Sequence, residues 1–359
     1  MHPLQLVTAL EGPLALNDNA LELCREFLRP EGVRFYQQVS RYCGYLADIL
    51  KQPGGQSGDA LKLILPFLKG HGLTNAMLSD YCRKHLRPVQ GAPGAFRFLH
   101  AQGFPIFGIS AGYRQFAEAL GQRLGFNDKH LFCTELDLDR YQLPEAEADE
   151  LLRLEQEIAS APEIALPQDA ASPQDLPDPV QTAIQVCSRT FRERLPAMDI
   201  GVIYREVKPL DGAQRAQALE ESLSRTGLAM KDLIYVGDSV SDVQAFATVR
   251  AGGGLAISFN GAPAAVKAAE LMVIADNAWP IALLASVFHL WGQEGVGELA
   301  AKGTAGASRY LVLPEAVIDT LMQGLQGRNF NLYSAANPGL EKVIQESAAM
   351  RARLQGPGV

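Results

Sequence analysis

The sequence predicts an α/β protein whose core is a doubly wound parallel sheet. Short apolar runs bounded by Gly, Pro, Asp or Asn occur at residues 5–10, 104–110, 232–238, 253–260 and 270–276. Most are apolar at consecutive positions, as in strands that are buried on both faces of a parallel sheet. Helical patterns lie between them, at residues 113–125, 213–227 and 243–252. Strands that alternate with helices of this length are typical of βαβ units.

Two inserts interrupt this alternation, so the core is expected to comprise residues 1–13, 91–133 and 205–279. Residues 14–90 carry mostly helical patterns and predict a helical cap. Residues 134–204 predict an acidic insert: a helix at 145–160, a partly flexible Pro- and Asp-rich linker at 167–179, and a second helix near 179–195. Residues 280–359 predict a C-terminal helical extension with helices at 280–301, 313–325 and 337–354.

Composition excludes several classes of protein. The net charge is −8 and no block of five basic residues occurs, which argues against nucleic-acid binding. The run from Trp279 to Trp291 is too short to span a membrane and predicts a buried core helix. The N-terminus lacks the basic region of a signal peptide. The five cysteines form no CxxC pair, so we expect neither disulfides nor zinc, and a cytoplasmic location is the simplest interpretation.

The strongest local signal is GDSVSD at residues 237–242, which follows an apolar run and precedes a helix. Ligands of open α/β sheets bind at the carboxyl ends of the strands, so Asp238 is expected at the mouth of a site. Asp242 follows one helical turn later on the same face. Two carboxylates there favour Mg²⁺, which prefers oxygen ligands. Alternatively, Asp238 and Ser239 only cap the next helix.

GDSVSD resembles the fourth motif of the haloacid-dehalogenase-like (HAD) superfamily, whose acidic residues hold Mg²⁺. The resemblance implies a Rossmann-like core, and it implies that Ser110, at the end of the second apolar run, hydrogen-bonds the transferring phosphoryl group. The third motif of the superfamily supplies a cation. Lys208, in the context Val-Lys-Pro, is our first candidate for it, and Arg215 is the alternative.

The first motif departs from the superfamily pattern, in which an aspartate ending the first strand attacks phosphorus and binds the metal. Ala9 stands at that position, and Glu11 stands where the second acid, a general acid/base, is found. A methyl group can neither attack phosphorus nor bind Mg²⁺. Thr8 is adjacent, but in a strand its side chain would point to the opposite face.

Three interpretations of Ala9 remain open. The nucleophile was lost naturally, leaving a degenerate phosphatase that binds a phosphorylated or acidic small molecule or performs other metal-assisted chemistry. Alternatively, the chain is an inactivated Asp-to-Ala variant of a Mg²⁺-dependent phosphohydrolase. In the third, which is the weakest, Glu11 is itself the nucleophile. We favour natural loss, with weakened Mg²⁺ binding at Asp238 and Asp242.

The wider sequence, including EGPLALNDNALELC and GGGLAISFNG, resembles a subgroup of predicted HAD hydrolases linked to archaeal energy-converting hydrogenase loci. That resemblance covers most of residues 5–280. Asn260 ends one of the predicted strands and is expected to line the pocket. The C-terminal helices predict either packing against the sheet edge or an interface, as in a homo-oligomer or a non-enzymatic interaction protein, and packing is favoured.

Overall fold

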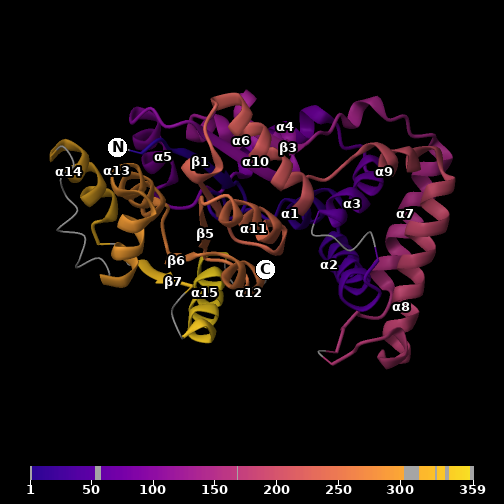
Figure 1. Ribbon diagram of the computed structural model, residues 1–359. Coiled ribbons are helices and arrows are strands. Elements are labelled where there is room, and N and C mark those ends of the chain that lie inside the picture. The colour runs from indigo at the N-terminus through magenta and orange to yellow at the C-terminus, as the bar shows by residue number, and fades with distance from the viewer. Residues whose placement is uncertain are drawn as a thin grey trace.

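The computed structural model describes residues 2–52, 58–167, 169–302, 315–327, 330–335 and 339–355. Its centre is a seven-stranded sheet in the order β3-β2-β1-β4-β5-β6-β7 (Figure 1). All neighbouring strands are parallel except the pair β6 and β7. The strands are β1 (Gln5–Ala9), β2 (Ile106–Tyr113), β3 (Leu131–Thr134), β4 (Leu233–Gly237), β5 (Leu255–Phe259), β6 (Leu271–Ala275) and β7 (Phe330–Ser334).

The predicted doubly wound, Rossmann-like fold is confirmed, and each of the five apolar runs contains a strand. Strand β1 lies between β2 and β4. The chain adds β2 and β3 on one side of β1, and then crosses to add β4, β5 and β6 on the other side. The sequence analysis missed β3 and β7. β3 has four residues, too few for a pattern, whereas β7 is a half-exposed antiparallel edge strand within a region where only helices were expected.

Helices cover both faces of the sheet. On one face, α10 (Gly212–Thr226) and α11 (Val243–Ala251) bury Leu219 and Phe246 against Phe107 and Tyr235. The other face packs on α5 (Ala92–Ala101), α6 (Arg114–Leu124) and α13 (Trp279–Lys302). Because apolar side chains are removed from water on both faces, the strands are apolar at consecutive positions.

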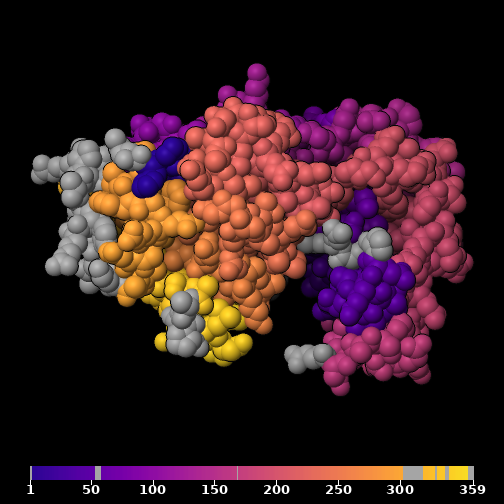
Figure 2. All heavy atoms as spheres, viewed as in Figure 1, coloured from indigo at the N-terminus to yellow at the C-terminus, as the bar shows by residue number. Residues whose placement is uncertain are grey.

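The two inserts pack together. Helices α2 (Gly32–Gly44) and α3 (Asp59–Gly70) contact α7 (Glu145–Ser160), and α8 (Asp178–Arg189) and α9 (Ile203–Glu206) join them. Helix α1 (Asn19–Phe27) contacts α2 and α3, while α4 (Asn75–His85) packs on α6 of the core. Helices α2, α3, α7, α8 and α9 form the cap to the right of the sheet in Figure 1, and Figure 2 shows a hollow between cap and core.

The C-terminal extension also packs on the core. Helix α13 is largely buried between Trp279 and Phe288, as the core-helix interpretation predicted. Helix α14 (Glu315–Leu325) packs on α13, and α15 (Leu340–Gln355) packs on β6 and on α12 (Pro263–Ala268). Among the described residues, no helix is long and apolar enough to cross a membrane.

Candidate ligand and metal site

The candidate site lies where the winding of the sheet changes direction. Glu11 follows β1, Asp238 follows β4, and Ser110 lies in β2, so three neighbouring strands bring these side chains to one edge. The carboxyl ends of strands on either side of such a switch point diverge and leave a crevice. The fold therefore assembles Glu11, Ser110 and Asp238 as the sequence predicted.

Glu11 is held by a dense set of donors. Its Oε1 accepts hydrogen bonds from Ser110 Oγ at 2.7 Å, Asn19 Nδ2 at 3.2 Å and the Gly112 amide at 3.2 Å. A Cβ at Gly112 would lie 2.5 Å from this oxygen, so the close approach requires glycine. Burial nevertheless raises the pKa of Glu11 above its usual value. Its Oε2 is buried and has no hydrogen-bond partner in the described structure, so that atom remains available to a ligand.

Ala9 is the last residue of β1 and pairs with Ile109 of β2. Its side chain is 1% exposed. Thr8 is fully buried, and its hydroxyl donates to the Ala9 carbonyl oxygen at 2.9 Å. Burial raises the pKa of the Cys43 thiol, in the neighbouring cap, to about 12, so that group is not a thiolate at neutral pH. At the end of β1 itself, the Ala9 methyl group cannot act as a nucleophile.

Asp242 is engaged with protein groups and does not line the pocket. Its Oδ1 accepts from Arg215 Nη1 at 2.5 Å and from the Tyr235 hydroxyl at 2.6 Å. Its Oδ2 accepts from the amides of Asp238 and Ser239, at 2.9 and 2.8 Å. Burial alone would raise the pKa of Asp242, but Arg215 and these donors hold it below the usual value. The predicted metal-ligand role therefore requires a carboxylate that is already fully hydrogen-bonded.

Asp238 is held differently. It is half-buried, and a Cβ at Gly12 would lie 2.2 Å from its carboxyl group. Gly12 has φ +83°, so glycine at this position permits both the turn after β1 and the close approach of Asp238. Burial and the nearby Asp242 carboxylate raise the pKa of Asp238 to about 8. A carboxylate in that situation gains most from a bound cation.

Of the two candidates for the cation, Arg215 and Lys208, the structure brings only Arg215 to the site. Lys208 is exposed and does not line the pocket, whereas Arg215 is 4% exposed and does. Asp242 and Tyr235 raise the pKa of Arg215 although burial opposes them. Arg215 lies in the first turn of α10, beneath β4. The Lys-Pro context that favoured Lys208 does not occur at a position inside a helix. Its Nε is buried without a hydrogen-bond partner in the described structure.

Asn260, which directly follows β5, lies beside the site. Its side chain donates to the Ala275 carbonyl oxygen at 2.7 Å and accepts from the Ala275 amide at 2.9 Å. This anchors the turn after β5, where Asn260 has φ +47°. It lines a small cavity together with Asp238 and Arg351.

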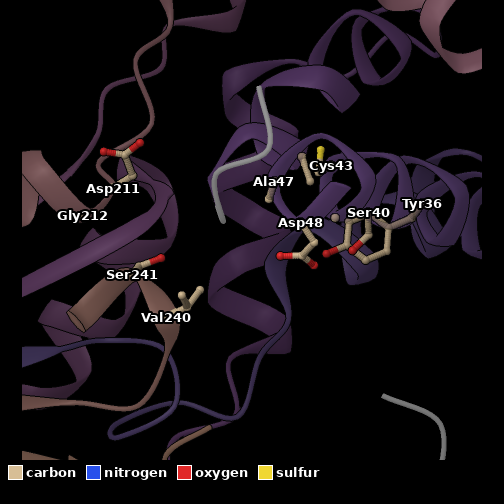
Figure 3. A pocket seen from close by; sticks show the side chains of 11 residues that line it. Tyr36, Ser40, Cys43, Ala47, Asp48, Asp211, Gly212, Val240 and Ser241 are labelled. Carbon is tan, nitrogen blue, oxygen red and sulfur yellow. The ribbon is translucent and has the colours of Figure 1, made fainter. Parts of the chain in front are cut away.

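Two connected hollows extend from these residues. The first, of about 350 Å³, is lined by Glu11, Gly112, Arg215 and Asp238 and also by Asp18 and Arg351, which the sequence analysis missed. The second, of about 500 Å³, lies between core and cap. Figure 3 shows Asp211 and Ser241 of the core on one side of it and Ser40, Asp48 and Tyr36 of the cap on the other. Tyr36, Ala60 and Ser241 line both hollows, so the two adjoin.

The residues present fit a divalent ion only in part. Among the described residues, no three or more His, Cys, Asp and Glu side chains are grouped so as to hold a metal. Two features still favour a cation: the buried, unpartnered Oε2 of Glu11 and the raised pKa of Asp238. Oxygen donors of this kind suit Mg²⁺. With Ala9 contributing no oxygen, we expect Glu11 and Asp238 to hold it weakly.

Comparison with known proteins supports the fold. The structure of gene product AF1437 from Archaeoglobus fulgidus matches with a TM-score of 0.77 and 26% identity, covering 99% of this chain and 97% of that one. The chain shares with that protein its doubly wound, Rossmann-type fold. A phosphoserine phosphatase with a phospho-aspartyl intermediate analogue matches at a TM-score of 0.43 and 16% identity, covering 75% and 92% of the two chains.

Sequence comparison is less informative. No model of a known protein family matches the chain. A cadmium, zinc and cobalt-transporting ATPase from Bacillus subtilis is 36% identical over 85 residues, which are 24% of this chain and 11% of the ATPase. The chain thus corresponds to a small part of that protein.

Proposed function

We propose that this chain is a degenerate phosphatase, that is, a HAD-like protein without the aspartyl nucleophile. It binds a small phosphorylated or acidic molecule at the ends of β1, β2 and β4. A divalent ion such as Mg²⁺, held by Asp238 and Glu11, would offset the charge of the acids and coordinate oxygens of the ligand. Repurposed metal-assisted chemistry at Glu11 is the enzymatic form of the same proposal.

The observation that carries this proposal is the alanine at the end of β1. Beside it stand the Ser110 hydroxyl and the Gly112 amide, which donate to Glu11 in this structure, and Arg215, which is paired with Asp242. A bound anion would compete with these two carboxylates for the same donors. Backbone amides and guanidinium groups are the usual donors to phosphate oxygens. The pocket therefore keeps binding groups but has no side chain able to form a phospho-enzyme.

The alternative is a Mg²⁺-dependent phosphohydrolase inactivated by a single Asp-to-Ala change. The intact arrangement of Glu11, Ser110 and Asp238 favours it, because a site that has drifted for long should lose more than one residue. Glu11 as nucleophile is disfavoured, because its Oε1 already accepts three hydrogen bonds. Membership of the hydrogenase-linked subgroup, a cytoplasmic location and a homo-oligomeric state remain predictions.

The test compares the chain with its Ala9→Asp variant and with Ala9→Asn as a matched control of nearly equal volume. We expect the unaltered chain to bind inorganic phosphate in the presence of Mg²⁺, measured by isothermal titration calorimetry, and to release no p-nitrophenol from p-nitrophenyl phosphate. Turnover by Ala9→Asp and not by Ala9→Asn would favour the single-change alternative. Mg²⁺-dependent turnover by the unaltered chain, or failure to bind phosphate, would overturn the proposal.

A further inference from the structure

The C-terminal helix α15 reaches the candidate site although it lies outside the predicted core. Arg351, in its last turns, lines both the 350 Å³ hollow and the small cavity beside it. In Figure 1, α15 lies next to α12 at the lower edge of the sheet. A cation from the far end of the chain therefore lies at the strand ends, close to Asp238.

The position of Arg351 is fixed by the packing of its helix. Val343 is buried against Met272 and Ile274 of β6 and against Val266 of α12. One turn later, the Ser347 hydroxyl donates to the Gly261 carbonyl oxygen at 2.7 Å. A helix anchored at both positions presents its next turn in a defined direction. Arg351 is thus part of a packed element, unlike a cation on a loose tail.

The charges of the pocket explain why such a cation matters. The acids Glu11, Asp18 and Asp238 line the hollow, and its cations are Arg215 and Arg351. Arg215 is already neutralised by Asp242 at 2.5 Å. Without Arg351, the lining would keep three acids and one cation that is already paired, so any of these acids that is ionised would repel an anionic ligand.

Arg351 is also available to a ligand. In the described part of the chain it forms no ion pair or hydrogen bond with another side chain, whereas its neighbour Arg353 lies 3.4 Å from Asp276. Arg351 therefore lines the same hollow as these acids, and among the described residues it forms no ion pair with any of them.

We propose that Arg351 is an anion-binding residue of this pocket, so that α15 forms part of the ligand site. It takes a phosphate or carboxylate group of the small molecule, beside the groups contributed by β1, β2 and β4. The proposal rests on the proposed function, since it assigns a residue to the binding of the same class of ligand.

Isothermal titration of inorganic phosphate with Mg²⁺ present tests the assignment in Arg351→Ala, Arg351→Lys and the matched control Arg353→Ala. Loss of a charged hydrogen bond should weaken phosphate binding by about ten- to a hundredfold in Arg351→Ala. Arg351→Lys should recover part of it, and Arg353→Ala should stay within about twofold.

A second titration, of Mg²⁺ alone, distinguishes binding from a merely structural role. Removing a positive charge near Asp238 should tighten Mg²⁺ binding a few-fold, by roughly the strength of a screened charge pair. Opposite shifts for phosphate and Mg²⁺ support the assignment, whereas parallel weakening of both overturns it. If the unaltered chain and Arg351→Ala bind phosphate equally, the assignment is wrong and the proposed function stands. If the unaltered chain binds no phosphate, the proposed function itself fails.

Discussion

Arg215 Nη1 lies 2.5 Å from Asp242 Oδ1, and both side chains are buried beneath the candidate site. This pair fixes the turn after β4, because the other oxygen of Asp242 accepts the amides of Asp238 and Ser239. Asp242 of the GDSVSD motif thus acts on the candidate site through the backbone that carries Asp238.

The pair should dominate the stability of this region. Replacing Arg215 by Met leaves the Asp242 carboxylate buried and uncompensated, which should cost about 3–5 kcal/mol in free energy of unfolding. Urea denaturation measures the loss. Arg153→Ala, which breaks exposed pairs with Glu150 and Glu157, is the control and should cost less than about 1 kcal/mol. Equal losses in the two variants would show that the buried pair contributes no more to the free energy of unfolding than an exposed pair does.

Gly12 should be required for the position of Asp238. In Gly12→Ala, a Cβ would collide with the Asp238 carboxyl group, and the backbone would keep φ +83°. We expect a loss of roughly 1–2 kcal/mol from the left-handed conformation, a further loss from the collision, and weaker Mg²⁺ binding. Gly72→Ala is the matched control for Gly12→Ala, because Gly72 has a similar φ of +79° and nothing lies within 4 Å of its Cβ position.

Thermal unfolding and calorimetric Mg²⁺ titration of both glycine variants provide the measurements. Gly72→Ala should lower the melting temperature through backbone strain alone and leave Mg²⁺ binding unchanged. Unchanged Mg²⁺ binding in Gly12→Ala would contradict the geometry described for Asp238.

Stability without divalent ions should depend on pH through Asp238. Its pKa is about 8 in the folded chain, against about 3.9 for an unfolded Asp. Between these values the folded chain holds a proton that the unfolded chain has lost. This contribution to stability is therefore fully present below pH 4 and declines as pH rises toward 8.

Asp238→Asn removes that titration, so its melting temperature relative to the unaltered chain should rise between pH 5 and pH 8.5 in EDTA. Parallel curves would mean that Asp238 titrates normally. Adding Mg²⁺ at pH 8 should stabilise the unaltered chain more than the variant, since the ion favours the carboxylate.

The strands of the core could be predicted because burial on both faces leaves an uninterrupted apolar run, as in DLIYVGD around β4. Glu11, Ser110 and Asp238 could be placed together because the carboxyl ends of parallel strands share one edge. The sequence also contains a local signal for the hydrogen bonds that Asp242 forms, although the sequence analysis interprets Asp242 as a metal ligand. Ser239 and Asp242 form a capping box, in which the acid binds the backbone amide of the first residue.

Other parts of the site had no local signal. Arg215 meets Asp242 only because α10 packs on α11 beneath β4. Arg351 reaches the pocket from more than a hundred residues beyond GDSVSD, and nothing in its neighbourhood distinguishes it from Arg353. The packing of helices that are distant in the sequence places these two side chains, and hydrophobic periodicity gives no information on such packing.

The order in which the strands are laid down has a consequence for synthesis of the protein. β1 is made first, yet it lies inside the sheet between β2 and β4, and β4 is more than two hundred residues away in the sequence. During synthesis, the edge of β1 that pairs with β4 stays uncovered until β4 has been made. Arg351 is added to the pocket later still. A nascent chain halted before α15 would therefore have the strand ends of the pocket without the cation that Arg351 contributes.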